Sequence, residues 1–349
     1  MPLTSPAPLL QVDNLTKHFA QTGGGWGKPK SVVKAVQDVS FHINEGETLG
    51  LVGESGSGKS TTGRLLLRLI EATNGTCVFD GKPVFGLSKA DLRALRREMQ
   101  IVFQDPYGAF NPRMTIGRIL SEGMELGGIR SRADRETESK RLLEMVQMPA
   151  DVRNRYPHEF SGGQRQRIGI ARALAVEPRF LVADEPVSAL DVSTQAEIVN
   201  LLLDLQARLN LTMLFISHDL SVVRVLADRV AVMYAGRILE MADSRSLFAH
   251  PLQPYTQELL AAIPTPDPLL ARRAPRSPKA DTTDTAAGSE ADGCPFAGRC
   301  PHTMDVCRAQ MPPLVDYAAR LGEDAPHLAA CHWVEQSLPI AAAASVPSA

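Results

Sequence analysis

Residues 53–60 read Gly-Glu-Ser-Gly-Ser-Gly-Lys-Ser, and this octet constrains the fold more than any other segment of the chain. It fits the pattern G-x-x-x-x-G-K-S/T, whose glycines let backbone N–H groups surround a phosphate without a clash at Cβ. An apolar strand is predicted over 48–52 and a Leu-rich helix over 60–70, with its positive N-terminal end facing the anion. The alternative, a chance Gly/Ser loop, does not explain these flanks.

The octet also predicts which residues contact a nucleotide. Lys59 would reach the β- and γ-phosphates, and the Ser60 hydroxyl would ligate Mg²⁺. The predicted nucleotide contacts of this segment are Gly53, Glu54, Ser55, Gly56, Ser57, Gly58, Lys59, Ser60 and Thr61.

A second apolar strand, 180–183, ends in the acidic pair Asp184 and Glu185. A buried strand that delivers a carboxylate beside a phosphate loop is a common way to hold Mg²⁺. We therefore predict Asp184 as a metal ligand and Glu185 as the general base that polarises the attacking water. The alternative is an acidic pair that caps a helix.

Strands and helices alternate along the chain, which predicts an α/β fold with a largely parallel sheet. Strands are expected over 9–19, 32–43, 100–103, 179–183 and 211–217, a hairpin over 77–84, a helix over 91–97, and mostly helix over 110–160, where 131–141 is a solvated charged face. A Gly-rich turn is predicted over 21–30.

Charge and hydropathy exclude several classes of protein. Lys and Arg total 37 and Asp and Glu total 39, and this net charge of −2 argues against a nucleic-acid partner. No apolar stretch approaches the roughly 20 residues needed to span a bilayer, and the N-terminus does not resemble a signal peptide. A cytosolic protein is expected, with any membrane role passing through partner subunits.

Residues 161–164 read Ser-Gly-Gly-Gln at the start of a helical run, where the Ser hydroxyl and the Gly amides would form a second anion site at a helix N-terminus. Taken alone, the four residues are also compatible with a Gly-rich turn. Together with the following residues to Leu174, the segment resembles the signature motif of ATP-binding-cassette (ABC) ATPases. The resemblance implies a head-to-tail dimer, in which Ser161, Gly162, Gly163 and Gln164 of one subunit close over the γ-phosphate bound by the other.

Four further positions are similar to family residues. Phe19 resembles the aromatic residue that stacks on adenine, and Gln104 the glutamine that approaches Mg²⁺ and water. Asp191 ends a segment, 188–191, that resembles the one crossing between two ATPases, and His218 resembles the switch histidine that bonds the γ-phosphate. The alternatives are a core strand residue for Phe19, a polar turn for Gln104 and a structural histidine for His218.

The resemblance implies a P-loop NTPase core with an antiparallel β subdomain, an inserted helical subdomain and a small Cys-containing C-terminal extension. The expected boundaries are 9–249 for the ABC ATPase domain (helical subdomain about 105–165), 250–262 for the start of the extension, 263–293 for a flexible linker, 294–335 for the Cys-rich region and 336–349 for a disordered tail.

Three segments, Gln104–Met114, Asp184–Ser193 and His250–Thr256, are similar to the ATPases of dipeptide and oligopeptide importers. Departures at Ala109, Phe110 and Gln253 do not touch the chemistry. The expected partners are a second ATPase, favouring a heterodimer, two membrane permeases and an extracytoplasmic binding protein, with this chain at the cytoplasmic membrane face. Nickel, glutathione or other peptide-like cargo is the alternative for the transported substrate. The alternatives for the class of protein are a non-transport ABC ATPase and, more distantly, a non-hydrolysing regulator or a small-molecule kinase.

Cys294, Cys300, Cys307 and Cys331 gather in the C-terminal region, whereas Cys77 is expected to be a core or turn residue. Clustered cysteines in a cytosolic chain indicate metal ligands more often than disulfides. Four thiolates suit a [4Fe–4S] cluster, and the importer extension resembles regions that hold one. Zinc, with His302, His327 or His332 as further ligands, and unligated thiols are the alternatives.

Overall fold

The computed structural model describes residues 7–20, 32–105, 108, 110–129, 131–263 and 293–338. The predicted Gly-rich turn at 21–30 lies outside these ranges, as does all but the ends of the predicted linker at 263–293.

A mixed sheet of eight strands forms the centre of the molecule, in the order β11-β12-β10-β9-β3-β8-β7-β6. Strands β9, β3, β8, β7 and β6 are parallel, and β10, β12 and β11 continue the sheet in antiparallel pairs. The predicted parallel sheet is thus confirmed as the central part of a mixed one. The strands are β3 Thr48–Val52, β6 Met99–Val102, β7 Phe180–Asp184, β8 Thr212–Ser217, β9 Arg229–Tyr234, β10 Arg237–Asp243, β11 Val315–Asp316 and β12 Leu328–Ala329.

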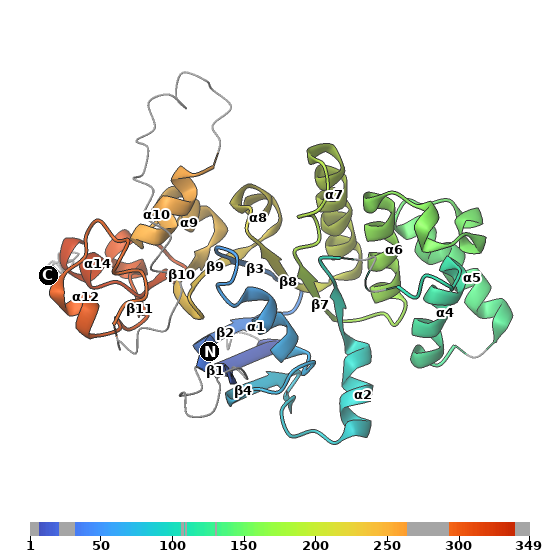
Figure 1. Cartoon of the computed structure of the whole chain (residues 1–349), viewed down its shortest axis with the longest axis horizontal. Coiled ribbons are helices and arrows are strands. Elements are labelled where there is room, and N and C mark those ends of the chain that lie inside the picture. The colour runs from blue at the N-terminus through green and yellow to red at the C-terminus, as the bar shows by residue number, and fades with distance from the viewer. Residues whose placement is uncertain are drawn as a thin grey trace, which may run out of the picture.

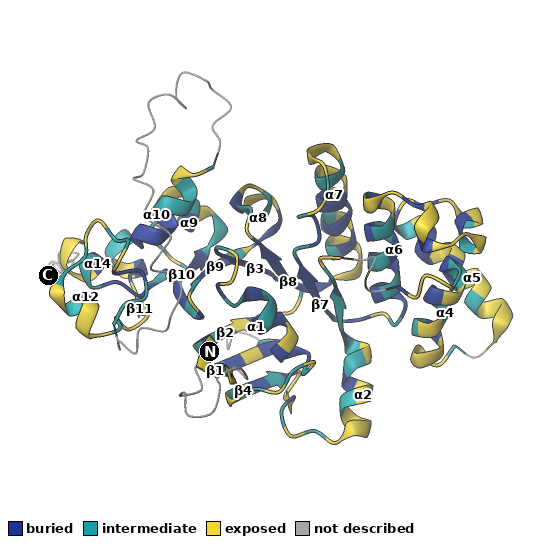
Figure 2. Ribbon diagram, viewed as in Figure 1, coloured by how far each residue is buried: buried dark blue, intermediate teal, exposed yellow. Residues whose placement is uncertain are grey.

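Strands β3, β7 and β8 are buried along their whole length and mostly apolar, because both faces of the sheet are covered (Figure 2). Along β7, Phe180 and Val182 join the core shared with the N-terminal sheet. Leu181 and Ala183, between them, join the opposite core, which includes the helical region. This alternation follows from the period of two in a strand.

The N-terminal sheet is antiparallel with the order β2-β1-β4-β5, as the resemblance implied. It consists of β1 Leu10–Ala20, β2 Val32–Ile43, β4 Asn74–Phe79 and β5 Lys82–Pro83, and two helices accompany it, α1 Lys59–Leu66 and α2 Lys89–Glu98. The predicted helix over 60–70 is wrong in its end: Arg68 adopts a left-handed φ of 48°, which a continuing α-helix excludes.

A helical region lies at one end of the molecule, beyond α7 (Figure 1). Its apolar side chains, among them Ile119, Leu120 and Leu142, enter the main core, while the outer face of α5 is exposed, as its charge pattern predicted. The helices here are α4 Ile116–Gly127, α5 Arg132–Met145, η1 Ala150–Asn154, η2 Pro157–Glu159, α6 Gly162–Leu174 and α7 Val192–Leu209.

The C-terminal extension lies at the opposite end and is joined to the cassette through the main sheet, because β12 pairs with β10 (Figure 1). The remaining helices are α8 Leu220–Leu226, α9 Ser244–Ala249, α10 Pro254–Ala261, α12 Asp305–Ala309, α13 Ala318–Leu321 and α14 His332–Ser337. Helix α14 therefore corrects the predicted start of a tail at 336. None of the helices in the described ranges has the length and apolar character needed to cross a bilayer.

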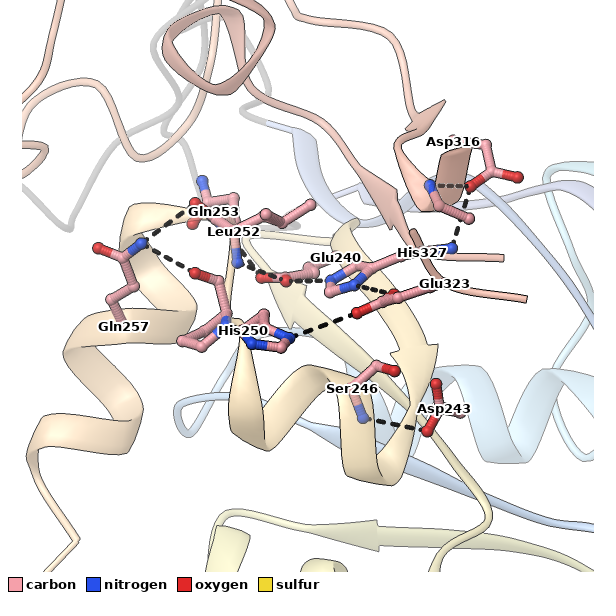
Figure 3. A network of polar contacts seen from close by, with 12 residues as sticks. Glu240, Asp243, Ser246, His250, Leu252, Gln253, Gln257, Asp316, Glu323 and His327 are labelled. Atoms are coloured by element: carbon pink, nitrogen blue, oxygen red, sulfur yellow. Dashed lines mark hydrogen bonds and ion pairs between the residues drawn. The ribbon is translucent and has the colours of Figure 1, made fainter. Parts of the chain in front are cut away.

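A buried polar network fastens the extension to β10 (Figure 3). The His327 ring and the Glu240 carboxylate are both fully buried, with Nε2 2.8 Å from Oε1. His327 Nδ1 lies 3.0 Å from Glu323, and Glu240 also accepts the backbone N–H groups of Leu252 and Gln253. Every polar atom of this pair thus has a partner supplied by the docked extension or the segment before α10.

Candidate functional site

The loop at 53–58 connects β3 to α1, as predicted, and its glycines fit the space available. Gly53 has φ 152°, and a Cβ there would lie 2.0 Å from the Met233 carbonyl oxygen. Gly58 has φ 107°, and a Cβ there would lie 2.3 Å from the Ala35 carbonyl oxygen. Gly56, also at positive φ, faces open space. The loop therefore needs glycine at both ends for close packing and presents its middle outward.

Lys59 lies across this loop at the first position of α1. Its ammonium donates to the carbonyls of Gly53 at 2.7 Å and Glu54 at 2.8 Å, and only 3% of the residue is exposed. Burial lowers the pKa of Lys59, opposed by the charges of Glu185 and Asp184. A cation held in this position is prepared to bind an anion at the loop.

Ser60 and Asp184 meet directly, joining α1 to the end of β7. The Ser60 hydroxyl donates to Asp184 Oδ1 at 2.6 Å, and Arg64 lies 3.8 Å from the other carboxylate oxygen. Asp184 is 2% exposed, and burial raises its pKa, opposed by the Ser60 hydrogen bond. A hydroxyl and a carboxylate form the hard oxygen donor set that Mg²⁺ prefers, so these residues fit the predicted ion.

Glu185, Gln104 and His218 converge from the ends of three neighbouring strands. Gln104 Nε2 donates to Glu185 Oε2 at 3.0 Å, and His218 Nδ1 lies 3.3 Å from the same oxygen. The strands β6, β7 and β8 are parallel, so their carboxyl ends meet at one edge of the sheet. The three residues predicted as catalytic are therefore one cluster, although they are up to 114 positions apart in sequence.

The signature segment forms the beginning of α6. Ser161 caps the helix by accepting the N–H of Gln164 at 3.3 Å, and the Gln164 side chain accepts the N–H of Ser161 at 3.0 Å. Both residues are exposed. Gly163 packs against α7, where a Cβ would lie 2.3 Å from Thr194 Cγ2.

Asp191 and Phe19 occupy separate places in the structure. Asp191 caps α7 and accepts bonds from Ser193 and Thr194, which lower its pKa to about 2. Phe19 is 40% exposed near the end of β1, with the Lys17 ammonium 4.9 Å from its ring centre. An exposed ring is available for stacking, and its role in binding adenine stays a prediction.

The C-terminal cysteines are free, and the predicted cluster receives no support from the structure. Burial, with smaller contributions from the other three thiols, raises the pKa of Cys294 to about 11. Yet in the described ranges, which include all four cysteines, no group of three or more His, Cys, Asp or Glu side chains is placed to hold a metal ion. Cys77 is a core residue of β4, as expected, and burial raises its pKa to about 12.

The histidines that the zinc alternative invoked have other partners. The His302 ring stacks on Trp333 with centres 4.1 Å apart, and His332 lies 3.2 Å from the Gln310 carbonyl. His327 is paired with Glu240.

Three residues at the site were missed in the sequence. Ser188 accepts from Gln104 at 3.3 Å, the Tyr255 hydroxyl accepts the N–H of Glu54 at 2.9 Å, and Arg299 pairs with the Glu54 carboxylate. Ser188 and Tyr255 lie in segments already singled out by resemblance. Arg299 lies among the cysteines, 245 positions from Glu54, and carries no local signal.

Two family models and many curated proteins match this chain. The family model "ABC transporter" matches residues 36–188, and "Oligopeptide/dipeptide transporter, C-terminal region" matches 239–307. A Brucella ovis protein named for peptide import ATP binding is 54% identical over 307 residues, covering 88% of this chain and 94% of its own. The oligopeptide transport ATP-binding protein OppF of Bacillus subtilis is 53% identical over 262 residues, covering 74% and 84%.

Solved structures show the same fold. The ATP-binding cassette MJ0796, in a dimeric post-hydrolysis state with ADP and Pi, aligns with a TM-score of 0.61 at 29% identity and covers 68% of this chain and 99% of its own. CbiO1 from Clostridium perfringens, part of the complex cbiONQ, aligns with a TM-score of 0.60 at 27% identity and covers 70% and 91%. This chain belongs to the ATP-hydrolysing, ATP-binding proteins of ABC transporters, of the oligopeptide/dipeptide type.

Proposed function

We propose that this chain powers the import of peptides by hydrolysing ATP at the loop 53–60, with Glu185 as the general base. The observation that carries the proposal is the convergence of Gln104 and His218 on one oxygen of Glu185. Glu185 follows directly after Asp184, which bonds Ser60 of the phosphate loop. A base, two polar groups and a metal-side carboxylate thus share one sheet edge.

Each group has a distinct task in this mechanism. Lys59 leaves its two carbonyl partners to bind the β- and γ-phosphates, and the loop N–H groups hold the remaining charge. Ser60 and Asp184, with Gln104 nearby, would hold Mg²⁺, which neutralises phosphate charge when bound. Glu185 accepts a proton from the attacking water while His218 donates to the γ-phosphate, so that catalysis depends on positioning and electrostatics.

The exposed signature segment, Ser161–Gln164, completes the site of a neighbouring ATPase. The cap at the start of α6 leaves the Ser161 hydroxyl and the Gly162 backbone at the surface, and a helix N-terminus attracts anions. Two subunits arranged head to tail would each close this corner over the other's γ-phosphate, with Asp191 in the segment between them.

Cargo and assembly are inferred from the relatives. Proteins 53–54% identical are named for oligopeptide transport or peptide import, and the matched C-terminal model is that of oligopeptide/dipeptide transporters. We therefore propose peptides as cargo, a second and different ATPase as partner, two permeases and an extracytoplasmic binding protein. The chain would sit at the cytoplasmic face of the membrane, bound through the permeases by the region after Gln104.

Replacing Glu185 by Gln tests the mechanism. The amide keeps the size of the side chain but cannot take the proton, so turnover should fall about 10²–10⁴-fold, the usual contribution of a general base. Nucleotide affinity should be retained. The measurements are steady-state ATP hydrolysis and binding of a fluorescent ATP analogue. Parental turnover in the variant would show that another group is the base.

The iron–sulfur cluster remains a prediction from the sequence. The lack of a metal-ion site in the described part of the chain opposes it. Protein purified without oxygen decides the matter: a brown colour with about four irons per chain would establish the cluster. A colourless protein with zinc or no metal would exclude it.

A further inference from the structure

The C-terminal extension contacts the phosphate loop directly, through Arg299. Its two terminal nitrogens bind the two carboxylate oxygens of Glu54, each at 3.0 Å, in a bidentate pair. One of these nitrogens also donates to Glu258 of α10. Planar, two-pronged pairing of this kind fixes the orientation of both side chains as well as their separation.

A cluster of three aromatic rings lies against Arg299, and two of them contact its guanidinium. Tyr234 at the end of β9, Tyr255 on α10 and Phe296 of the extension pack edge to face or tilted, with centres 4.6–5.5 Å apart. The guanidinium lies 5.5 Å from the centre of Phe296 and 5.9 Å from that of Tyr234. Tyr255 and Phe296 are almost fully buried, so the platform is part of the core.

Each polar group of Glu54 has a hydrogen-bond partner, and these partners come from three different parts of the chain. Its N–H donates to the Tyr255 hydroxyl, its carbonyl accepts from Lys59, and its carboxylate binds Arg299. Glu54 is the second residue of the phosphate loop, so its unpaired charge would repel a bound polyphosphate. Pairing with Arg299 both fixes the loop and neutralises that charge.

We propose that Arg299 is a positioning residue for nucleotide binding, which acts through Glu54 and makes the affinity of the phosphate loop depend on the docked extension. The inference rests on ATP binding at this loop. In this proposal the extension contributes to the nucleotide site of its own chain, through Glu54, whereas the proposed contribution of Ser161 is to the site of a neighbouring subunit.

The test is the affinity of the full-length chain for a fluorescent, non-hydrolysable ATP analogue with Mg²⁺. Arg299→Gln should weaken binding about tenfold, which is the value of a charged, bidentate pair after discounting for its partial exposure. In a Glu54→Gln background the same substitution should change affinity by less than about twofold, because no charge remains to neutralise. Arg320→Gln is the matched control: Arg320 is also in the extension but contacts Glu335 and Tyr317.

A purely structural role predicts a different pattern, in which Arg299→Gln weakens binding equally in both backgrounds. Equal weakening in both backgrounds would overturn the proposal. So would an Arg299→Gln protein with the affinity of the parent, or an Arg320→Gln protein whose affinity falls as much as that of Arg299→Gln. If Arg299→Gln alone does not fold, Arg299→Lys, which keeps the charge but loses the fork, takes its place with a smaller expected loss. Failure of the proposed function would be recognised separately, because the parent chain would then not bind the analogue.

Discussion

Glu185, the proposed general base, has a strained backbone. Its φ is 47°, in the left-handed region that non-glycine residues avoid, while its N–H bonds the Ile216 carbonyl at 3.0 Å. Such strain persists where the surrounding structure holds it, and it accumulates at functional sites. Here it directs the carboxylate toward Gln104 and His218.

This strain predicts a gain in stability when the side chain is removed. Glu185→Gly should be more stable than Glu185→Gln by about 1 kcal/mol, because glycine adopts positive φ without a Cβ penalty. Both variants lack the base and should be inactive. Thermal melting measures the difference, expected to be about 2 °C for a chain of this size. If the melting temperature of Glu185→Gly is equal to or lower than that of Glu185→Gln, the backbone at this position is not strained.

At the level of elements, the start of α6 is set by its packing against α7. A Cβ on Gly163 would overlap Thr194 Cγ2, so Gly163→Ala should destabilise the protein by about 1–3 kcal/mol. Thr194→Ser removes that methyl group but keeps the hydroxyl that bonds Asp191, and it should restore most of the loss. Thermal melting of the two single variants and the double variant gives the coupling. Additive effects would mean that the two residues do not meet.

The attachment of the extension should depend on pH through His327. Burial lowers the pKa of its ring, but pairing with Glu240 and Glu323 raises it more, and the net direction is upward. The stabilising contribution is therefore complete below the ordinary histidine value of about 6.5 and is lost as pH rises through the raised pKa. The other charged groups nearby are His250, Asp243 and Asp316.

Hydrogen exchange of the β12 amides measures this directly (Figure 3). After correction for intrinsic rates, protection should be complete below about pH 6.5 and should fall as the pH rises above that value, and His327→Gln should remove the pH dependence. His302→Gln, in the same extension but stacked on Trp333, should retain it. Equal pH profiles for the parent and His327→Gln would contradict the assignment.

The sequence predicted the local elements well and the long-range ones poorly. The strands around Leu51 and Val182 were evident because an apolar run between turn signals has a local pattern. The hairpin of β9 and β10 was overlooked, although Ala235 and Gly236 form a short turn between apolar strands. Strand β12 is two residues long, too short to show a period.

The candidate site shows the same contrast between local and long-range signals. Lys59, Asp184 and Glu185 were found because motif spacing fixes them relative to a strand end. The pairing of Arg299 with Glu54 depends on tertiary packing of the extension, which nothing near either residue records. The candidate residues at strand ends could therefore be singled out from the sequence, whereas the residues that pair with them across the fold could not.

For the whole molecule, the arrangement leaves one side of the nucleotide site incomplete. The phosphate loop follows β3 at the centre of the main sheet, the extension contacts it from one end of the molecule, and the signature segment belongs to the helical region at the other end (Figure 1). Ser161 and Gln164 bond each other and are exposed. The exposed start of α6 and the His218 side chain, which is 54% exposed, are surfaces that a second ATPase would cover in the proposed arrangement.

If two ATPase subunits close on the nucleotide, the mass of the particle in solution should rise from that of one subunit to that of a pair. The Glu185→Gln chain, which binds ATP without consuming it, should form a pair with a second ATPase in MgATP but not in MgADP, as measured by light scattering after size exclusion. Adding Ser161→Arg should prevent pairing, because the long side chain blocks the helix start that must approach the phosphate. The phosphate loop and Asp184 at the end of β7 are untouched by this change, so nucleotide affinity should persist. The heterodimer prediction requires the pair to contain two different chains, and a homodimer of equal affinity would correct it. Pairs that form equally in ATP and ADP, or that survive Ser161→Arg, would show that the nucleotide does not join the subunits.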